Sequence, residues 1–387
     1  MIIGIPKEIM LGENRVSATP DTVALMVNDG HQVLVERGAG QGSHFSDSMY
    51  EEKGGKIIED ARDIFKRAQV ILKVKEPLFN TKYQTHEVDM MHQGQYIISF
   101  LHPASPSNHE MVRRLADKGV ISLTLDGIPR ISRAQNMDAL TSMSTVAGYK
   151  GILIAANHMA KFVPPIFSAV GGSKPAKALI IGAGVGGLQA LATAKRLGAL
   201  TYALDIRPQA QEEAKSLGAK VIDPNVPQDL AVGEGGYAKA LDKTHLEIER
   251  KALSEVLADM DIIFLSALVP GRKAPILITK DMLSLLKPGS VIIDISIDQG
   301  GNCQETVPGE IVEKDGVTIC GIKNIPGMLP ASATWMFAQN IYNLLKYLVK
   351  EDKIPLDLED EIIQGILTTK DFKITHQGTL DAMNEST

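Results

Sequence analysis

The stretch of sequence that decides the fold is LIIGAGVGGL at residues 179–188, which Asp205 follows at the end of a second apolar run. The pattern predicts a strand, a glycine turn, a helix and another strand that ends in an acid. Gly182 permits the tight turn, Gly184 lets the backbone approach a pyrophosphate, and Gly187 lets the helix pack closely on the strand. The pyrophosphate would then lie on free N–H groups at the N-terminus of the helix. These residues therefore predict a Rossmann-type dinucleotide site.

Asp205 also indicates which dinucleotide is bound. Its carboxylate can accept hydrogen bonds from the ribose hydroxyls of the adenosine and would repel the extra 2′-phosphate of NADP(H). We therefore expect NAD(H), although Arg207, two residues further on, carries a positive charge that opposes this discrimination. The alternative is a glycine-rich turn without a ligand, and the predicted strand, helix and acid around the glycines argue against it.

Length and composition limit the class of protein. A chain of 387 residues is too long for one ordinary core and predicts two domains. Its net charge of −6 includes no basic block, so we expect neither nucleic acid nor an anionic membrane as a partner. The two cysteines, Cys303 and Cys320, have no metal-ligand spacing to histidine, so no metal is expected. No apolar run is long enough to span a bilayer, so we expect a cytoplasmic protein without direct membrane insertion.

Strand and helix patterns alternate along most of the chain, as in βαβ units with parallel sheets. Long helical patterns at residues 138–161 and 332–348 are expected to cross between two such series. We predict an α/β fold with two Rossmann-like, doubly wound parallel-sheet domains joined by long helices. The first would be discontinuous, residues 1–137 and 330–387, and residues 138–329 would form the NAD(H)-binding domain. The predicted strands are residues 2–5, 32–36, 70–74, 95–100, 120–125, 177–181, 201–204, 220–222, 261–265, 291–295 and 317–322.

One segment interrupts this alternation. About forty residues separate the strands at 220–222 and 261–265, far more than an ordinary connection. They include the string GEGGYAK at residues 233–239. This string is either a solvated excursion or a mobile loop that closes over a ligand, with glycine hinges and Tyr237 as its anchor.

The string PRISRAQNMD at residues 129–138 lies between a predicted strand and the long helix. Such junctions at the carboxyl edge of a parallel sheet are where ligands bind in open α/β folds. Arg130 and Asp138 could pair, and Gln135 could orient a carboxamide through one donor and one acceptor. The alternative is a surface ion pair with a helix cap.

A third set of polar residues includes three that follow predicted strands, namely Lys75, His102 and Asp298, together with Arg15 near the N-terminus. Arg15 and Lys75 could hold a small carboxylate, and His102 could act as an acid or base beside a carbonyl. A single histidine after a strand is more often a structural hydrogen-bonding group. Three polar groups at three strand ends favour a site.

The chain resembles, along nearly its full length, the alanine dehydrogenase and nicotinamide nucleotide transhydrogenase superfamily. The matching strings are GIPKE at 4–8 with Arg15-Val16, VERGAG at 35–40, the glycine motif, ALVPG at 267–271 with Ala274-Pro275, and KPGS at 287–290. Two more strings, residues 129–138 and GGYAK at 235–239, resemble the NAD(H)-binding alpha subunit (domain I) of proton-translocating NAD(P) transhydrogenase, in which the second string is a mobile loop.

The resemblance implies roles for individual residues. Arg130, Gln135 and Asp138 would surround the nicotinamide. The rest of the NAD(H) site would be lined by Val185, Asp205, Gly236 and Leu268, together with Thr141, where transhydrogenases often have serine. The leading hypothesis is thus a transhydrogenase subunit that transfers hydride directly to NADP(H) on a partner subunit. A membrane subunit would be a second partner. The chain would form a homodimer at the inner face of the membrane.

Four positions resemble the other branch of the superfamily instead. Arg15, Lys75, His102 and Asp298 match substrate and catalytic residues of alanine dehydrogenases. The alternative hypothesis is therefore an NAD-dependent alanine (amino-acid) dehydrogenase. Arg15 and Lys75 would clamp the carboxylate, His102 would exchange a proton, and Asp298 would assist the attacking water or ammonia. A third hypothesis is an NAD-sensing protein with a vestigial pocket.

Overall fold

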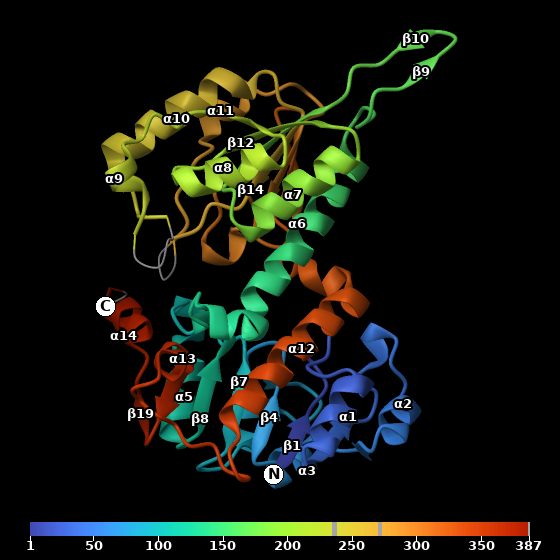
Figure 1. Cartoon of the computed structure of the whole chain (residues 1–387), viewed down its shortest axis with the longest axis vertical. Coiled ribbons are helices and arrows are strands. Elements are labelled where there is room, and N and C mark those ends of the chain that lie inside the picture. Colours follow the sequence, from blue (N-terminus) through green and yellow to red (C-terminus); the bar gives the residue numbers. More distant parts are fainter. Residues whose placement is uncertain (234–237, 270–272, 386–387) are drawn as a thin grey trace. The chain divides into compact units, whose positions relative to one another are not determined.

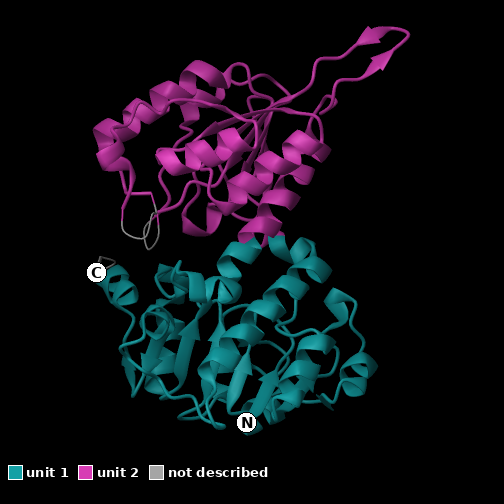
Figure 2. Ribbon diagram, in the orientation of Figure 1, with its two compact units in different colours: residues 1–143, 326–387 teal, residues 144–325 magenta. Residues whose placement is uncertain are grey.

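The chain divides into two compact units in the computed structural model (Figure 2). Unit 1 comprises residues 1–143 and 326–387, and unit 2 comprises residues 144–325. The structure describes residues 1–233, 238–269 and 273–385. Each unit has its own largely parallel sheet with helices packed against it (Figure 1). The predicted fold class, α/β with two Rossmann-like parallel sheets, is confirmed.

The sheet of unit 2 has seven strands in the order β13-β12-β11-β14-β15-β17-β16. All neighbours are parallel except β16 and β17. The chain first builds outward from β11 on one side and then continues from β14 on the other. The carboxyl ends of β11 and β14 therefore form the switch point at which open α/β sheets bind ligands. The strands are β11 (Lys177–Ile181), β12 (Leu200–Leu204), β13 (Lys220–Val221), β14 (Ile262–Leu265), β15 (Val291–Asp294), β16 (Ile311–Lys314) and β17 (Val317–Cys320).

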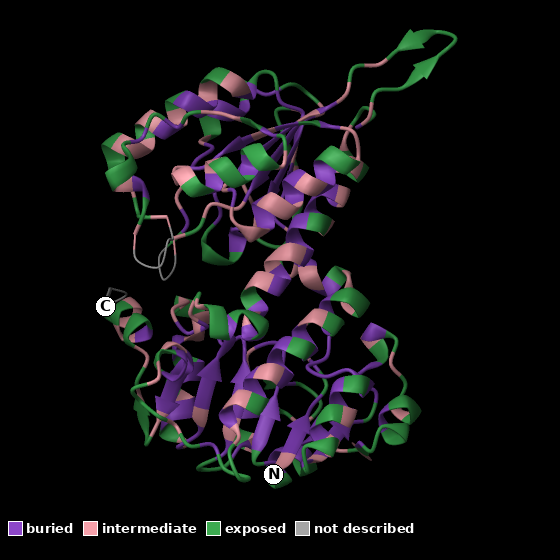
Figure 3. Cartoon of the chain, in the orientation of Figure 1, coloured by how far each residue is buried: buried purple, intermediate pink, exposed green. Residues whose placement is uncertain are grey.

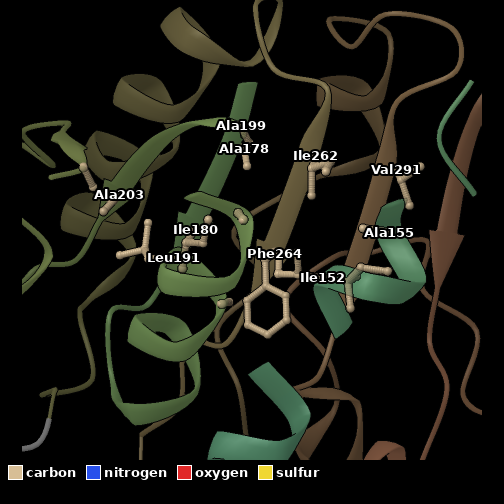
Figure 4. Packing of buried hydrophobic residues seen from close by; sticks show 14 of the residues in the cluster. Ile152, Ala155, Ala178, Ile180, Leu191, Ala199, Ala203, Ile262, Phe264 and Val291 are labelled. Atoms are coloured by element: carbon tan, nitrogen blue, oxygen red, sulfur yellow. The ribbon is translucent and has the colours of Figure 1, made fainter. Parts of the chain in front are cut away.

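Both faces of this sheet carry an apolar core, because alternate side chains of a strand point to opposite faces. Ile180 and Phe264 belong to the core under α6, α7 and α8, and Ile181 belongs to the core under α10 and α11. Figure 4 shows the first core, with Phe264 beside α6. Gly151 of α6 permits this approach, since a Cβ there would lie 2.7 Å from the Phe264 ring. The helices are α6 (Ala139–His158), α7 (Val185–Arg196), α8 (Pro208–Ser216), α9 (Gln228–Ala231), α10 (Lys243–Leu257) and α11 (Lys280–Leu283).

The sheet of unit 1 has eight strands in the order β19-β18-β8-β7-β4-β1-β2-β3. Its six parallel strands repeat the order of unit 2, with the switch point between β1 and β4. β18 pairs antiparallel with both β8 and β19, an edge to which no strand was assigned from the sequence. The strands are β1 (Ile2–Ile5), β2 (Gln32–Glu36), β3 (Lys56–Ile58), β4 (Val70–Leu72), β7 (Tyr96–Ser99), β8 (Ile121–Thr124), β18 (Leu367–Lys370) and β19 (Lys373–Ile374).

The central strands of both sheets are almost entirely buried, whereas their helices alternate between buried and exposed positions (Figure 3). The long helix α6 begins in unit 1 and continues into unit 2, and α12 follows the return of the chain to unit 1. The helices of unit 1 are α1 (Pro20–Asn28), α2 (Asp47–Glu52), α3 (Ala61–Arg67), α4 (Glu87–Met90), α5 (His109–Asp117), α12 (Pro330–Leu348), α13 (Glu361–Ile366) and α14 (Gln377–Glu385).

Two short hairpins stand apart from these sheets. In unit 1, β5 (Phe79–Asn80) pairs with β6 (Thr85–His86). In unit 2, β9 (Phe167–Ser168) pairs with β10 (Gly171–Gly172) at the tip of an arm that projects away from the body of the unit (Figure 1). The arm was not predicted from the sequence, because its strands are too short to show alternation.

Candidate nucleotide site and candidate acid–base site

The glycine turn after β11 has the geometry that a dinucleotide requires. Gly182 has a φ of +88°, and a Cβ there would lie 2.8 Å from the backbone nitrogen of Ala267. A Cβ at Gly187 would lie 2.0 Å from the carbonyl oxygen of Gly182. At Gly184 the space is open, because the nearest atom, Nη2 of Arg207, lies 4.0 Å from a Cβ position. Gly182 and Gly187 are thus required by the chain itself, whereas Gly184 leaves room for a ligand.

The first turn of α7 faces that open space. Gly184 is its N-cap, and no side chain caps the helix there. Val185, the first helical residue, is half-buried. The N–H groups of a first helical turn have no partner within the helix and carry the positive end of its dipole. An anionic group such as a pyrophosphate fits this helix end.

Asp205, directly after β12, is held rigidly beside the turn. It is 5% exposed, and its Oδ2 accepts the N–H of Ala183 at 2.8 Å. Arg207 donates its own N–H and its Nε–H to Oδ1, at 2.8 and 3.0 Å, and its Nη2–H to Oδ2 at 2.7 Å. The pairing raises the pKa of Arg207, although burial acts in the opposite direction. The predicted acid is therefore oriented by the glycine turn and neutralised by the arginine two residues later.

Glu249 of α10 is a second acid near Asp205, and it was missed in the sequence because a charged helix resembles a solvated surface. It is 5% exposed. Burial, together with the charge of Asp205, raises the pKa of the Glu249 carboxyl to about 7. An acidic residue at a buried-face position of α10 was the available signal.

The loops after β14 and β15 are tied together by Asn302. Its side chain donates to the carbonyl oxygens of Ala267 and Pro275 and accepts the N–H of Ala267. Leu268, a predicted site residue, follows directly and is 37% exposed. Asp298 lies in a short 3-10 helix after β15 and is exposed.

The predicted loop at residues 233–239 lies largely outside the described residues, and this includes Gly236 and Tyr237. Its described ends approach each other: Val232 and Ala238 form an isolated antiparallel bridge.

In unit 1, polar residues gather where β1, β4, β7 and β8 end. Arg15, 3% exposed, donates Nε–H and Nη2–H to the two carboxylate oxygens of Glu13 at 2.8 and 2.5 Å. Burial would raise the pKa of Glu13, but the hydrogen bonds and charge of Arg15, with the charge of Lys75, lower it. The guanidinium predicted to hold a substrate carboxylate thus holds one from the chain itself.

His102 and Asp126 form the most distinctive pair of this cluster. The imidazole Nδ1 lies 2.7 Å from Oδ1 of Asp126, and the backbone N–H of His102 donates to Oδ2 at 2.8 Å. His102 has a φ of +44°, unusual for a residue with a side chain, and its ring stacks on Phe100. Burial lowers the pKa of His102, but the carboxylate of Asp126 outweighs it and the pKa is raised. The pKa of Asp126 falls to about 2 despite burial, because of His102 and Thr124.

Asp126 was missed in the sequence, because an aspartate followed by glycine after a strand indicates an ordinary turn. Lys75 is 9% exposed and its charge acts on both Glu13 and His102. Behind it, the fully buried Lys73 lies 3.3 Å from Glu8 and 3.2 Å from Glu87. The structure therefore brings Arg15, Lys75 and His102 into one unit, while Asp298 belongs to the other.

The string at residues 129–138 forms a 3-10 helix over Ser132–Met137 and then the start of α6. Asp138 caps α6, accepting the N–H of Thr141 at 2.8 Å and its hydroxyl at 2.6 Å. Arg130 and Gln135 are exposed. Arg133, to which no role was given, binds Asp360 at 2.9 Å, Glu361 at 3.0 Å and the Tyr347 hydroxyl at 3.0 Å.

Across residues 1–233, 238–269 and 273–385, no group of three or more His, Cys, Asp or Glu side chains could hold a metal ion. Within the same ranges, no helix combines the length and the apolar character needed to cross a membrane.

The two sites and the doubled fold agree with what comparison with known proteins shows. Residues 4–147 match the N-terminal domain of the alanine dehydrogenase/PNT family, and residues 151–377 match its C-terminal domain. The chain therefore belongs to the alanine dehydrogenase/PNT family, as the sequence strings predicted.

Two curated relatives are named as transhydrogenase subunits. The chain is 40% identical to the NAD(P) transhydrogenase subunit alpha of Cereibacter sphaeroides over 97% of its own length and 71% of that protein. It is 38% identical to the first polypeptide of the NAD(P) transhydrogenase subunit alpha of Rhodospirillum rubrum, over 97% and 98% of the two chains. The alanine dehydrogenase of Bacillus subtilis is 33% identical over 86% of this chain and 82% of that protein.

Solved structures resemble the fold in the same two ways. The transhydrogenase structure from Sinorhizobium meliloti superposes with a TM-score of 0.82 at 34% identity, covering 97% of this chain and 99% of that one. A structure of L-alanine dehydrogenase gives a TM-score of 0.81 at 26% identity, with both chains fully covered.

Proposed function

We propose that this chain is an oxidoreductase, the NAD(H)-binding subunit of a proton-translocating NAD(P) transhydrogenase. It would exchange hydride between its own NAD(H) and NADP(H) held on a partner subunit, with a membrane subunit as the second partner. The observation that carries the proposal is the end-to-end match with the Rhodospirillum rubrum transhydrogenase polypeptide, at 38% identity over 98% of that protein. It is supported by the open glycine turn beside a buried acid.

The residues present fit a nicotinamide dinucleotide. The α7 N-terminus and Gly184 would receive the pyrophosphate, and Asp205 would accept the ribose hydroxyls. Arg130, Gln135 and Asp138 would orient the nicotinamide ring and its carboxamide. The bound nucleotide supplies or accepts the hydride, so the protein contributes orientation and exclusion of water, and no acid or base is needed.

Gln135→Ala tests this function. The variant should transfer hydride to NADP(H) on an added partner subunit at least about tenfold more slowly, while its Kd for NADH changes much less. Most binding contacts would lie on the adenosine and pyrophosphate side, away from Gln135. Gln339→Ala, an exposed glutamine of α12 in the same unit, is the matched control and should transfer at the parent rate. Equal transfer rates in both variants would overturn the role of Gln135.

An NAD-dependent amino-acid dehydrogenase is the second candidate, and the His102–Asp126 pair favours it. A histidine with a raised pKa, held by a carboxylate and close to the charge of Lys75, suits proton exchange beside the carbonyl of a 2-oxo acid. Hydride exchange between two nucleotides would not use such a pair.

Two variants in two assays separate the candidates. In the dehydrogenase, His102→Ala abolishes reduction of pyruvate with ammonium and NADH, while Gln135→Ala affects transfer between nucleotides only in the transhydrogenase. Activity of the parent protein with pyruvate, lost in His102→Ala, would overturn the leading proposal. No activity with pyruvate, together with transfer lost in Gln135→Ala, would overturn the second candidate.

We further propose that the chain forms a homodimer through the β9–β10 arm and is held at the inner face of the membrane by its partner subunits. The arm exposes Phe162, Phe167 and Val170, at 62%, 83% and 99%. Serine at Phe167 and Val170 together should turn a dimer into a monomer in light scattering. Leu11→Ser, at a site 99% exposed in unit 1, is the control and should stay dimeric. A monomeric parent protein would overturn this proposal.

A further inference from the structure

The carboxylate of Asp205 has no acceptor position left for a ligand. Its two oxygens offer about four lone-pair positions. The N–H groups of Ala183 and Arg207 fill one position on each oxygen, and Nη2–H and Nε–H of the Arg207 guanidinium fill the other two. The ribose hydroxyls of an adenosine need two of these positions. Something must therefore leave before a dinucleotide can bind there.

Only the guanidinium can leave without disturbing the fold. The N–H of Ala183 belongs to the glycine turn, and the N–H of Arg207 belongs to the residue that caps α8. The guanidinium is attached through a flexible side chain that is 15% exposed, and it lies at the open space beside Gly184. It thus occupies both the acceptor positions and part of the room that a ligand would use.

We propose that Arg207 is a specificity-determining residue of the nucleotide site. In the free chain its guanidinium occupies the positions on Asp205 that ribose hydroxyls take, so NADH binds by exchanging an ion pair for neutral hydrogen bonds. Once displaced, the guanidinium remains at the rim of the ribose site, where its positive charge tolerates a 2′-phosphate. Arg207 therefore weakens NADH binding and also reduces discrimination against NADPH. This inference rests on the nucleotide site of the proposed function.

Removing the guanidinium tests both effects. Arg207→Ala should lower the Kd for NADH about threefold to tenfold, since charge-assisted bidentate bonds no longer compete for Asp205. The Kd for NADPH should rise, because the carboxylate would face the phosphate without a counter-charge. The ratio of the two constants should increase at least about tenfold. Both constants are measured by calorimetric titration of the full-length protein.

Two further variants make the result decisive. Arg196→Ala removes the same charge from the exposed end of α7 and should leave the ratio unchanged. Arg207→Lys keeps the charge without the bidentate fork, so its ratio should fall between the parent and Arg207→Ala. A ratio in Arg207→Ala equal to that in Arg196→Ala, or weaker NADH binding in Arg207→Ala and Arg207→Lys, would overturn the inference alone. Failure of the parent protein to bind either nucleotide would overturn the proposed function as well.

Discussion

Replacing Gly187 by alanine should destabilise unit 2, whereas the same replacement at Gly184 should weaken nucleotide binding and leave the fold intact. The reason for the first effect is steric. A Cβ on Gly187 would lie 2.0 Å from the carbonyl oxygen of Gly182, more than 1 Å inside an ordinary contact. Because both atoms belong to rigid backbone, α7 would have to move away from β11.

The magnitude follows from that displacement. Overpacking a close-packed interior typically costs 1–3 kcal/mol, and a clash between two backbone segments belongs at the upper end, about 3 kcal/mol. For a unit of this size each kcal/mol shifts the melting temperature by about 2–4 °C, so unit 2 should melt roughly 6–12 °C lower.

Gly184 behaves differently because nothing presses on it. Its φ of −75° suits any residue, and the nearest atom to its Cβ position lies 4.0 Å away. Alanine is a poorer N-cap than glycine, a loss of less than about 1 kcal/mol. A methyl group there would keep the pyrophosphate from the helix N-terminus, so the Kd for NADH should rise at least about tenfold.

Scanning calorimetry of both variants resolves the melting transition of each unit, and calorimetric titration gives the Kd for NADH. Each variant is the control for the other, since both add one methyl group to the same turn. An unchanged transition in Gly187→Ala would refute the steric argument. Parent-like NADH affinity in Gly184→Ala would refute the assignment of Gly184 to the ligand.

Three further predictions concern charges. Asp205→Asn should weaken NADH binding by about 1–3 kcal/mol in a calorimetric titration, and an unchanged Kd would contradict its role. Because the folded state raises the pKa of Glu249 to about 7, stability falls as pH rises from its unfolded value through 7; Glu249→Gln should therefore raise the melting temperature more at pH 8 than at pH 5, and equal effects would contradict this. Asp126→Asn should lower the pKa of His102 in an NMR titration; since that pKa is raised, the pair stabilises fully below about pH 6.5 and less as pH rises through it. An unmoved titration would show that Asp126 does not set the pKa.

The part of the nucleotide site that depends on near neighbours could be predicted from the sequence. Strand, turn, helix and acid lie within one short stretch, and the predicted strands at residues 2–5, 32–36 and 177–181 have the same bounds in the structure. The acid–base pair shows the limit. His102 and Asp126 lie on loops after different strands, and only the parallel pairing of β7 with β8 brings those loops together.

The C-terminal edge of unit 1 shows the same limit. Residues 367–370, LTTK, have no apolar alternation, yet Thr368 and Thr369 are fully buried in β18. Thr369 bonds to Ser122 and to the carbonyl of Val120. These partners are far away in the sequence, so nothing local indicates that polar side chains can be satisfied inside the sheet.

The sequence by itself determined the α/β class, the family and the glycine turn, because periodicity, turn chemistry and strings of neighbouring residues are local properties. Tertiary structure alone decided which charges meet. It gave Arg15 to Glu13 rather than leaving it to a substrate, gave His102 to Asp126, and placed Glu249 near Asp205. The physical reason is that the strength of a charge pair depends on distance and burial, and strand order and helix packing set both.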